Sequence, residues 1–400
     1  MSNGQPATSN EKSASMSEKH FEPSFGKLAY LALGHFITDL YPAFLPPLLP
    51  LLVEKFQLSF TRVGLLAMVM SFSASLTQPV FGHLSDKLGG RKMIIWGPVV
   101  SGLSFSLIGL APHYSFLILL LILGGLGISS FHPEGAALTA SISDQKRTLI
   151  MSIFMLGGTV GIGIGPFLIL LIIVTLGLQW SFLACLPAFI TAWLLHKHAP
   201  QFEKEPSVPV SSGTSFRPPA NRKTFLFGIL MAIVVLRVTV VGSLTTFLPI
   251  IQNLRGFSLV VAGSSFSVFM LCGALGGLIG GYLADRVGRK KIILASFIMI
   301  IPVFLAFLYW KGPIGFIILA LLGFLFFLSE PPCIVLAQEL IPQRARTASS
   351  LIMGTAWGLA GFGVLGTGAL ADAMGIEWSL RLLLLLPVGS LALSFLLPKK

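Results

Sequence analysis

Residues 82–92 of the chain read GHLSDKLGGRK, and residues 281–290 read GYLADRVGRK. Both copies follow a long apolar segment, and both place an aspartate four residues after the first glycine, with a basic residue directly after it. They start 199 positions apart, and the second copy lacks one glycine. The likeness is too detailed for chance composition, so the chain consists of two halves that repeat each other.

The composition predicts a protein that lives in lipid. Of its 400 residues, 54% are hydrophobic and only 10% are charged, against about 25% charged in ordinary soluble domains. A water-soluble globule of this composition would leave large apolar patches in water, so we exclude that class. The three cysteines lie inside apolar runs without metal-ligand spacing, and we interpret them as packing residues.

Apolar segments long enough to cross a bilayer, about 20 residues each, recur along the chain. They are too long and too continuously apolar for the strands of a β-barrel. The twelve predicted spans are approximately 25–53, 61–83, 93–111, 114–140, 148–174, 178–197, 224–251, 259–283, 292–310, 314–340, 346–371 and 378–398.

Polar segments divide these spans into two groups of six. Residues 1–24 contain no apolar stretch and predict a disordered cytoplasmic tail. Residues 198–223 are rich in Pro, Ser and charge and predict a flexible cytoplasmic linker. We therefore expect one six-helix bundle over residues 25–197 and a second over residues 224–400.

The basic residues predict the orientation. With a cytoplasmic amino terminus, most of the 27 Lys and Arg residues fall on the cytoplasmic side, where such residues collect in membrane proteins. Both termini are then cytoplasmic. The net charge of +12 is explained by this topology, so no nucleic-acid partner is needed. The opposite side receives only Lys55, Arg62, Arg255, Lys311 and Arg381.

The string at 82–92 resembles the signature loop of the major facilitator superfamily, whose parallel six-helix repeats are joined by a central linker. Two further strings, HFITD at 35–39 and FHPEG at 131–135, resemble the fosmidomycin resistance branch of bacterial drug exporters. The resemblance covers about residues 25–398. It implies an all-α membrane protein of the bacterial inner membrane, with twelve transmembrane helices in two pseudo-symmetric bundles.

The family also implies proton-driven efflux of a small molecule by alternating access. The expected partners are the small-molecule substrate, protons and membrane lipid. We expect a monomer without cofactor or metal. A membrane enzyme is disfavoured because the sequence offers no His-rich cluster, Ser-His-Asp arrangement or suitable Cys pair.

The signature loop has a physical role of its own. In the family, the acid that stands here as Asp86 faces the positive amino-terminal end of helix eleven, near residues 347–350, and this contact can latch one state of transport. The alternative is a solvated surface charge. The residues that we assign to gating in the two copies are Gly82, Asp86, Lys87, Gly89, Gly90, Arg91, Asp285, Arg286 and Arg289.

The fifth span carries glycines at four-residue spacing, Gly157, Gly161 and Gly165. They share one helix face and permit close backbone contact. Gly161, Gly165 and Pro166 resemble the first part of the helix-five signature of drug and proton antiporters, and Pro166 can supply a bend. The second part of that signature is missing, since residues 169–170 are Ile and Leu. We assign these three residues to gating, with plain helix packing as the alternative.

Ionisable side chains near mid-span are the candidates for the transport site, because a charge at the bilayer centre costs about 2.5–3.5 kcal/mol on insertion scales. For proton coupling we assign His35, Asp39, His132, Glu134 and Glu330. For substrate binding we assign Arg237, Asp39 and Glu330.

His35 and Asp39 lie four residues apart, on one face of the first helix, and a histidine beside a carboxylate can titrate near neutral pH. The prolines between residues 42 and 50 loosen the outer half of this helix. His132 and Glu134 point about 200° apart on a regular helix, so we expect both to face a cavity only if Pro133 distorts the turn. Glu134 is our first candidate for the proton carrier.

The alternative for His35 and Asp39 is a structural hydrogen bond between helices. Glu134 or Glu330 can instead be a neutral packing residue.

Arg237 stays protonated at any working pH and must be paired. Its partner can be Asp39, Glu134 or Glu330, or an anionic group on the cargo. Competition between a proton and the cargo for this pair would produce antiport, so we expect export of a small anionic or amphiphilic compound, a fosmidomycin-like antibiotic or another drug. The alternatives are proton-coupled uptake of a small anionic metabolite and a transporter-like sensor.

We expect Asp86→Asn to abolish transport while the protein still folds and inserts, because the amide carries no charge to attract a helix amino terminus. The measurement is transport by the purified variant in liposomes, alongside its expression level and thermal unfolding. Normal transport by a well-expressed variant would contradict the gating role.

Overall fold

The computed structural model describes residues 25–88, 90–142, 147–199, 222–310, 312–342 and 345–398. All regular elements within these ranges are helical, and they form twelve spans that are long and apolar enough to cross a membrane. This confirms the predicted all-α membrane fold. The predicted tail, and residues 200–221 of the predicted linker, lie outside the described residues.

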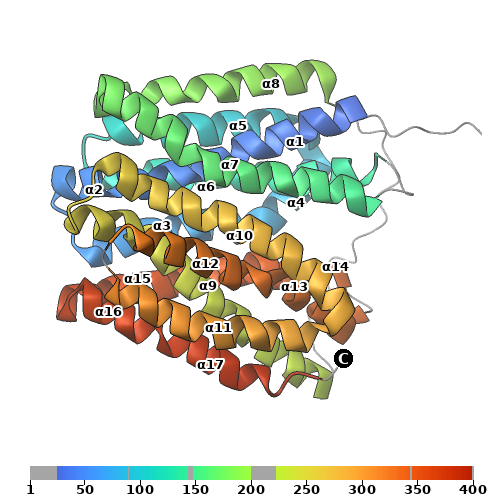
Figure 1. The fold of residues 1–400 in the computed structure, drawn as a ribbon. Helices are drawn as coiled ribbons and strands as arrows, with labels where there is room; N and C mark the ends of the chain where they lie inside the picture. Colours follow the sequence, from blue (N-terminus) through green and yellow to red (C-terminus); the bar gives the residue numbers. More distant parts are fainter. Residues whose placement is uncertain are drawn as a thin grey trace, which may run out of the picture.

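The twelve spans form two six-helix bundles, drawn in blue to green and in yellow to red in Figure 1. The first comprises α1 (Phe25–Leu40), η2 (Pro42–Phe44), α2 (Leu45–Phe56), α3 (Phe60–Ser75), α4 (Gln78–Leu88), α5 (Gly90–Ser106), η3 (Ile108–Leu110), α6 (Tyr114–Ala140), α7 (Arg147–Leu176), η4 (Leu178–Cys185) and α8 (Leu186–His198). The second comprises α9 (Arg222–Leu254), α10 (Leu259–Val287), α11 (Arg289–Tyr309), α12 (Ile314–Leu328), α13 (Glu330–Leu340), α14 (Ala345–Ser350), η6 (Leu351–Thr355), α15 (Ala356–Met374), α16 (Ile376–Leu383) and α17 (Leu385–Ser394).

Both ends of the described chain lie at one end of the molecule, on the right in Figure 1. We call this the basic end, because α5 and α11 begin there with Arg91, Arg289 and Lys290 close to their first residues. The opposite end, where α2 joins α3, is called the distal end.

Prolines interrupt two of the spans. The first span breaks after Leu40 into the short η2 and then α2, which agrees with the predicted loosening by its prolines. The tenth span breaks at Ser329, just before Pro331 and Pro332, because neither proline can donate a backbone hydrogen bond to the preceding turn. By contrast, α6 continues as a helix through Pro133.

The expectation that each signature string forms a loop was wrong for most of its length. In the second copy, α10 runs on to Val287, so Asp285 and Arg286 belong to its last turn. Gly288, with φ of 101°, makes the turn alone, and α11 begins at the next residue. A single glycine in a positive-φ conformation suffices to end the helix.

The first copy follows the same plan. There α4 extends to Leu88 and α5 starts at Gly90. Gly89, and the side chains of Asp86 and Lys87, lie outside the described part of the chain.

The basic residues of the two copies hold the ends of helices within their own bundle. Arg91 donates to the carbonyl oxygen of His196, near the end of α8. Lys290, the second residue of α11 as Arg91 is of α5, donates to the carbonyl oxygens of Phe395 and Leu397, just past the end of α17. A cation is favourable at a helix carboxyl terminus because unpaired carbonyls gather there.

Two further residues of the second copy show different surroundings. Arg289 forms an ion pair with Glu339 of α13, with 2.6 Å between Nη1 and Oε1. Asp285 is exposed and forms no ion pair with a described residue. Arg286 stacks over the ring of Tyr282.

The glycine face of α7 packs directly on the backbone of α1. A Cβ atom added to Gly157, Gly161 or Gly165 would overlap a carbonyl oxygen of α1. Such backbone contact is possible only for residues without a side chain. The predicted close packing is therefore present, and α7 remains one helix across Pro166.

The two bundles make their largest contacts along two seams. In the first, Gly64 of α3 fits against the backbone of Val364 and Leu365 in α15, and Gly368 of α15 fits against the carbonyl of Phe60. In the second, Gly163 of α7 faces the side chain of Leu271 in α10.

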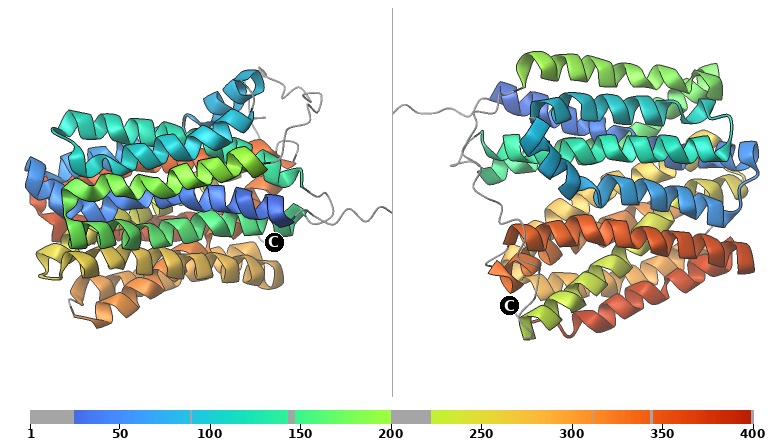
Figure 2. Two further views of the ribbon diagram at one scale, coloured as in Figure 1. Left: turned by 90° about the horizontal axis from the view of Figure 1, so that it is seen from above. Right: turned by 180° about the vertical axis from the view of Figure 1, so that it is seen from behind.

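The first seam is tightest at the distal end. Its contacts lie on α3, whereas α4 turns sharply away from the line of α3 (Figure 2). The described contacts therefore hold the molecule closed at the distal end.

We expect Gly161→Ala to lower the stability of the detergent-purified protein by roughly 1–3 kcal/mol, the usual cost of overpacking. The added methyl group would force α1 and α7 apart. Gly366→Ala is the matched control: this helical glycine has no atom within 4 Å of an added Cβ, so alanine there is neutral or slightly stabilising. Thermal unfolding measures both, and equal melting temperatures would contradict the packing argument.

Candidate functional site

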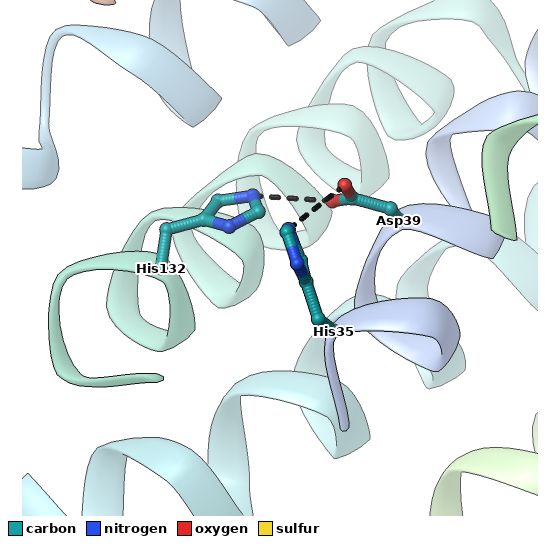
Figure 3. A group of neighbouring side chains, drawn as sticks. All are labelled: His35, Asp39 and His132. Carbon is teal, nitrogen blue, oxygen red and sulfur yellow. Dashed lines mark ion pairs between the residues drawn. The ribbon is translucent and has the colours of Figure 1, made fainter. Parts of the chain in front are cut away.

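Three polar side chains from α1 and α6 meet inside the first bundle (Figure 3). Asp39 lies between the two histidines: Nε2 of His35 lies 3.2 Å from Oδ2, and Nε2 of His132 lies 3.1 Å from Oδ1. The side chain of His35 is 4% exposed, while those of Asp39 and His132 are 14% and 22% exposed. The cluster is thus closed on the His35 side and partly open on the other.

The other nitrogen of His35 fixes its protonation. Nδ1 lies 2.7 Å from the carbonyl oxygen of Phe154, and because a carbonyl only accepts, Nδ1 carries a proton. Nε2 then faces a carboxylate oxygen, and this contact requires a second proton, on Nε2 or on Asp39, because two acceptors would repel each other. The geometry can therefore hold one exchangeable proton between His35 and Asp39.

The packing of α7 makes room for this pair. A Cβ added to Gly158 would lie 2.5 Å from Oδ2 of Asp39 and 2.6 Å from Nε2 of His35. The ring of Phe154, one turn earlier on α7, stacks on His35 with centroids 4.1 Å apart. The contributions of Phe154 and Gly158 were not predicted from the sequence, because they depend on how α7 is aligned along α1.

Among the described residues, this cluster also has the spacing of a metal site, with ligand atoms within 4.8 Å of one another. The N···O distances of 3.1 and 3.2 Å are those of hydrogen bonds. We therefore interpret His35, Asp39 and His132 as a hydrogen-bonded cluster.

Glu134 lies on a different face of α6. It follows Gly127 by seven residues, two full turns, and Gly127 packs on the backbone of Ser101 in α5. This position therefore lies on the α5 side of α6, and the residue is 8% exposed. Because α6 remains helical at Pro133, Glu134 and His132, which contacts Asp39, lie about 200° apart around the helix.

The second bundle holds a buried cation opposite an acid. Nη2 of Arg237, in the middle of α9, lies 3.7 Å from Oε1 of Glu330, and the two side chains are 3% and 26% exposed. Nη1 of Arg237 donates to the carbonyl oxygen of Phe326. The Nε atom is buried and has no hydrogen-bond partner among the described residues. Arg237 is therefore only partly satisfied by the protein.

The break between α12 and α13 builds this site. Glu330 is the first residue of α13 and follows the kink at Ser329. The two prolines after it remove backbone donors, which leaves carbonyl oxygens at the end of α12 free to accept from other groups. Of the three acids that the sequence left open as partners for Arg237, the structure brings Glu330 next to it.

The comparisons with known proteins agree with this architecture. The family model described as Major Facilitator Superfamily matches residues 31–365. The chain is 29% identical over 383 residues to the fosmidomycin resistance protein of Escherichia coli (strain K12), covering 93% of each chain. It is also 29% identical over 385 residues to the uncharacterized MFS-type transporter YfnC of Bacillus subtilis (strain 168), covering 93% of this chain and 92% of that one.

A solved structure shares the fold. A bacterial homolog of the human lysosomal transporter Spinster, in an inward-facing and occupied conformation, superposes with a TM-score of 0.78 at 15% identity, covering 94% of this chain and 97% of that chain. The family match spans most of the sequence and includes both bundles. The chain therefore belongs to the Major Facilitator Superfamily and is a multi-pass membrane transporter rather than an enzyme.

Proposed function

We propose that this protein is a proton-coupled antiporter of the bacterial inner membrane that exports a small anionic or amphiphilic compound by alternating access. The basic end is cytoplasmic in this proposal, because Lys and Arg concentrate on the cytoplasmic side of membrane proteins. The partners in this proposal are the small-molecule substrate, protons and membrane lipid, without a nucleic acid.

The observation that carries the proposal is the incomplete satisfaction of Arg237. Its guanidinium is buried, Nε lacks a partner among the described residues, and its acid lies 3.7 Å away, beyond hydrogen-bond distance. A permanent charge in such a setting attracts a second anionic group. The forked donors of arginine match carboxylate, phosphate or phosphonate.

Glu330 provides the link between the cargo and protons at this site. With an exposed fraction of 26% against 3% for Arg237, the carboxyl group of Glu330 is the more accessible to solvent of the two. A proton on Glu330 removes the competing negative charge, so the cargo anion can bind Arg237. Loss of that proton restores the internal pair and expels the anion, which is the cycle that an antiporter needs.

The cluster at Asp39 is the second proton site in this proposal. It holds one exchangeable proton between His35 and Asp39, and His132 provides a donor on its more exposed side. Asp39 lies in the first helix of the first bundle, and Arg237 lies in the first helix of the second. Each bundle then has a site that binds or releases a charge. The occupancy of both sites can shift the equilibrium between conformations in which the two bundles contact each other differently.

Export is favoured over uptake by the resistance function named for the relative from E. coli. The same site would also serve proton-coupled uptake of a small anionic metabolite. Direction is tested with purified protein in liposomes, an imposed pH gradient and a panel of labelled anionic compounds. Antiport is indicated if a compound accumulates inside the liposomes while protons flow out of them.

We expect Asp39→Asn to lose at least tenfold of the gradient-driven flux while exchange of substrate without a gradient persists. The asparagine cannot share the proton that His35 and Asp39 hold. Glu134→Gln is the discriminating variant, since Glu134 was our first candidate from sequence. Loss of coupling in Glu134→Gln together with full coupling in Asp39→Asn would transfer the proton role to Glu134.

We expect Arg237→Ala to weaken binding of an anionic substrate by roughly ten- to a hundredfold, the effect of losing a hydrogen bond to a charged group. Glu330→Gln should bind the same substrate with little dependence on pH, because its competing charge is gone. Arg381→Ala, which removes a positive charge at the distal end, is the control. A purely structural pair predicts that Arg237→Ala combined with Glu330→Gln restores transport, and this recovery would overturn the proposal.

A further inference from the structure

A carboxylate of the second bundle caps a helix of the first bundle. Oδ1 of Asp372, near the end of α15, accepts from the backbone nitrogen of Phe60 at 2.8 Å. Oδ2 accepts from the backbone nitrogen of Thr61 at 2.8 Å and from its hydroxyl group at 2.5 Å. Both oxygens are thus engaged by the first two residues of α3.

These bonds complete the cap of α3. The first turn of a helix has backbone N–H groups without partners inside the helix. Ser59, the N-cap residue, accepts from the nitrogen of Arg62, while Asp372 accepts from the two nitrogens before it. A negative charge is also favourable here because the helix dipole is positive at this end.

The contact is built to be reversible. Asp372 is exposed, so water can replace its bonds when the helices separate, and no charge is left in a dry environment. Thr61 and Phe60 likewise lie at the rim of the seam. Next to them, the backbone contact between Gly368 and Phe60 aligns the two helices, so the three hydrogen bonds form only when the seam is closed.

The same pair of antiparallel helices offers a counterpart at the basic end. The expected contact there joins Asp86, at the end of α4, to the helix that begins near residue 345, so each helix would contribute an acid to the amino terminus of the other. The contact of Asp372 is the distal member of this arrangement and was not anticipated from the sequence.

We infer that Asp372 is a gating latch, which holds the distal end closed while the basic end is open, and which must release α3 when the distal end opens. The inference rests on the contact itself and does not depend on which substrate or proton carrier is used. It concerns the equilibrium between the distal-open and distal-closed conformations, so it can be tested without a transport assay.

The test is a distance measurement across the distal end. Spin labels at Leu110→Cys and Leu254→Cys, both on exposed residues, report the separation of the two bundles after Cys185, Cys272 and Cys333 are replaced. We expect Asp372→Asn to raise the ratio of distal-open to distal-closed molecules about tenfold, because the amide loses the negative charge and keeps only one of the two acceptor oxygens. Thr61→Val, which removes only the hydroxyl bond, should give a smaller shift in the same direction.

Glu54→Gln is the matched control, because it removes an exposed acid at the same end and should leave the distances unchanged. Distances in Asp372→Asn and Thr61→Val that equal those of the parent protein would overturn the inference. If Asp372→Asn fails to fold, Thr61→Val decides alone: a shift toward the open form supports the latch, and its absence contradicts it. Unchanged distances overturn the inference whether or not the variants still transport.

Discussion

Charge must be paired or hydrated wherever it enters a bilayer, and this constraint organises the interior of the protein. Few ionisable groups lie near mid-span, and apart from Glu134 the structure places those that we assigned in two sites. In the first bundle a carboxylate is held between two imidazoles. In the second a guanidinium is held by one carbonyl and a more distant carboxylate. In the first site a proton can move between Asp39 and either histidine, whereas the guanidinium of Arg237 in the second site keeps its proton.

Backbone contact is the means by which the helices support these sites. Gly157, Gly161 and Gly165 bring α7 onto the carbonyls of α1, and Gly158, between them, leaves room for His35 and Asp39. If residues with larger side chains replaced these glycines, α7 would lie further from α1. His35 could then not reach the carbonyl of Phe154. The same glycines that pack the bundle therefore determine the protonation of its central histidine.

The internal repeat is preserved in structure but used for different purposes. Arg91 and Lys290 are each the second residue of their helix, and each binds carbonyl oxygens at the end of the sixth span of its own bundle. At the first helix of each half, by contrast, one copy carries an acid and the other a base. Common elements thus hold the helix ends of both bundles, while the first helices of the two bundles carry opposite charges at Asp39 and Arg237. Relative movement of such bundles changes the seams between them, and the distal seam is the tight one in this conformation.

The sequence by itself determined the class of the molecule. Hydropathy, the spacing of apolar runs and the repeated signature string were sufficient for twelve helices in two bundles, because each backbone group in lipid must be satisfied within its own helix. The i, i+4 spacing of His35 and Asp39 likewise made their contact predictable. Local helix geometry also predicted that His132 and Glu134 point apart unless Pro133 distorts the turn.

Only the tertiary structure decided which partners meet across helices. The choice of Glu330 for Arg237, the carbonyl of Phe154 for His35, and Asp372 as a cap of α3 all join residues that are far apart in the chain. Their contacts depend on how helices are rotated and aligned along one another. Hydrophobic periodicity in a bilayer leaves that alignment open, because lipid and protein surfaces are equally apolar.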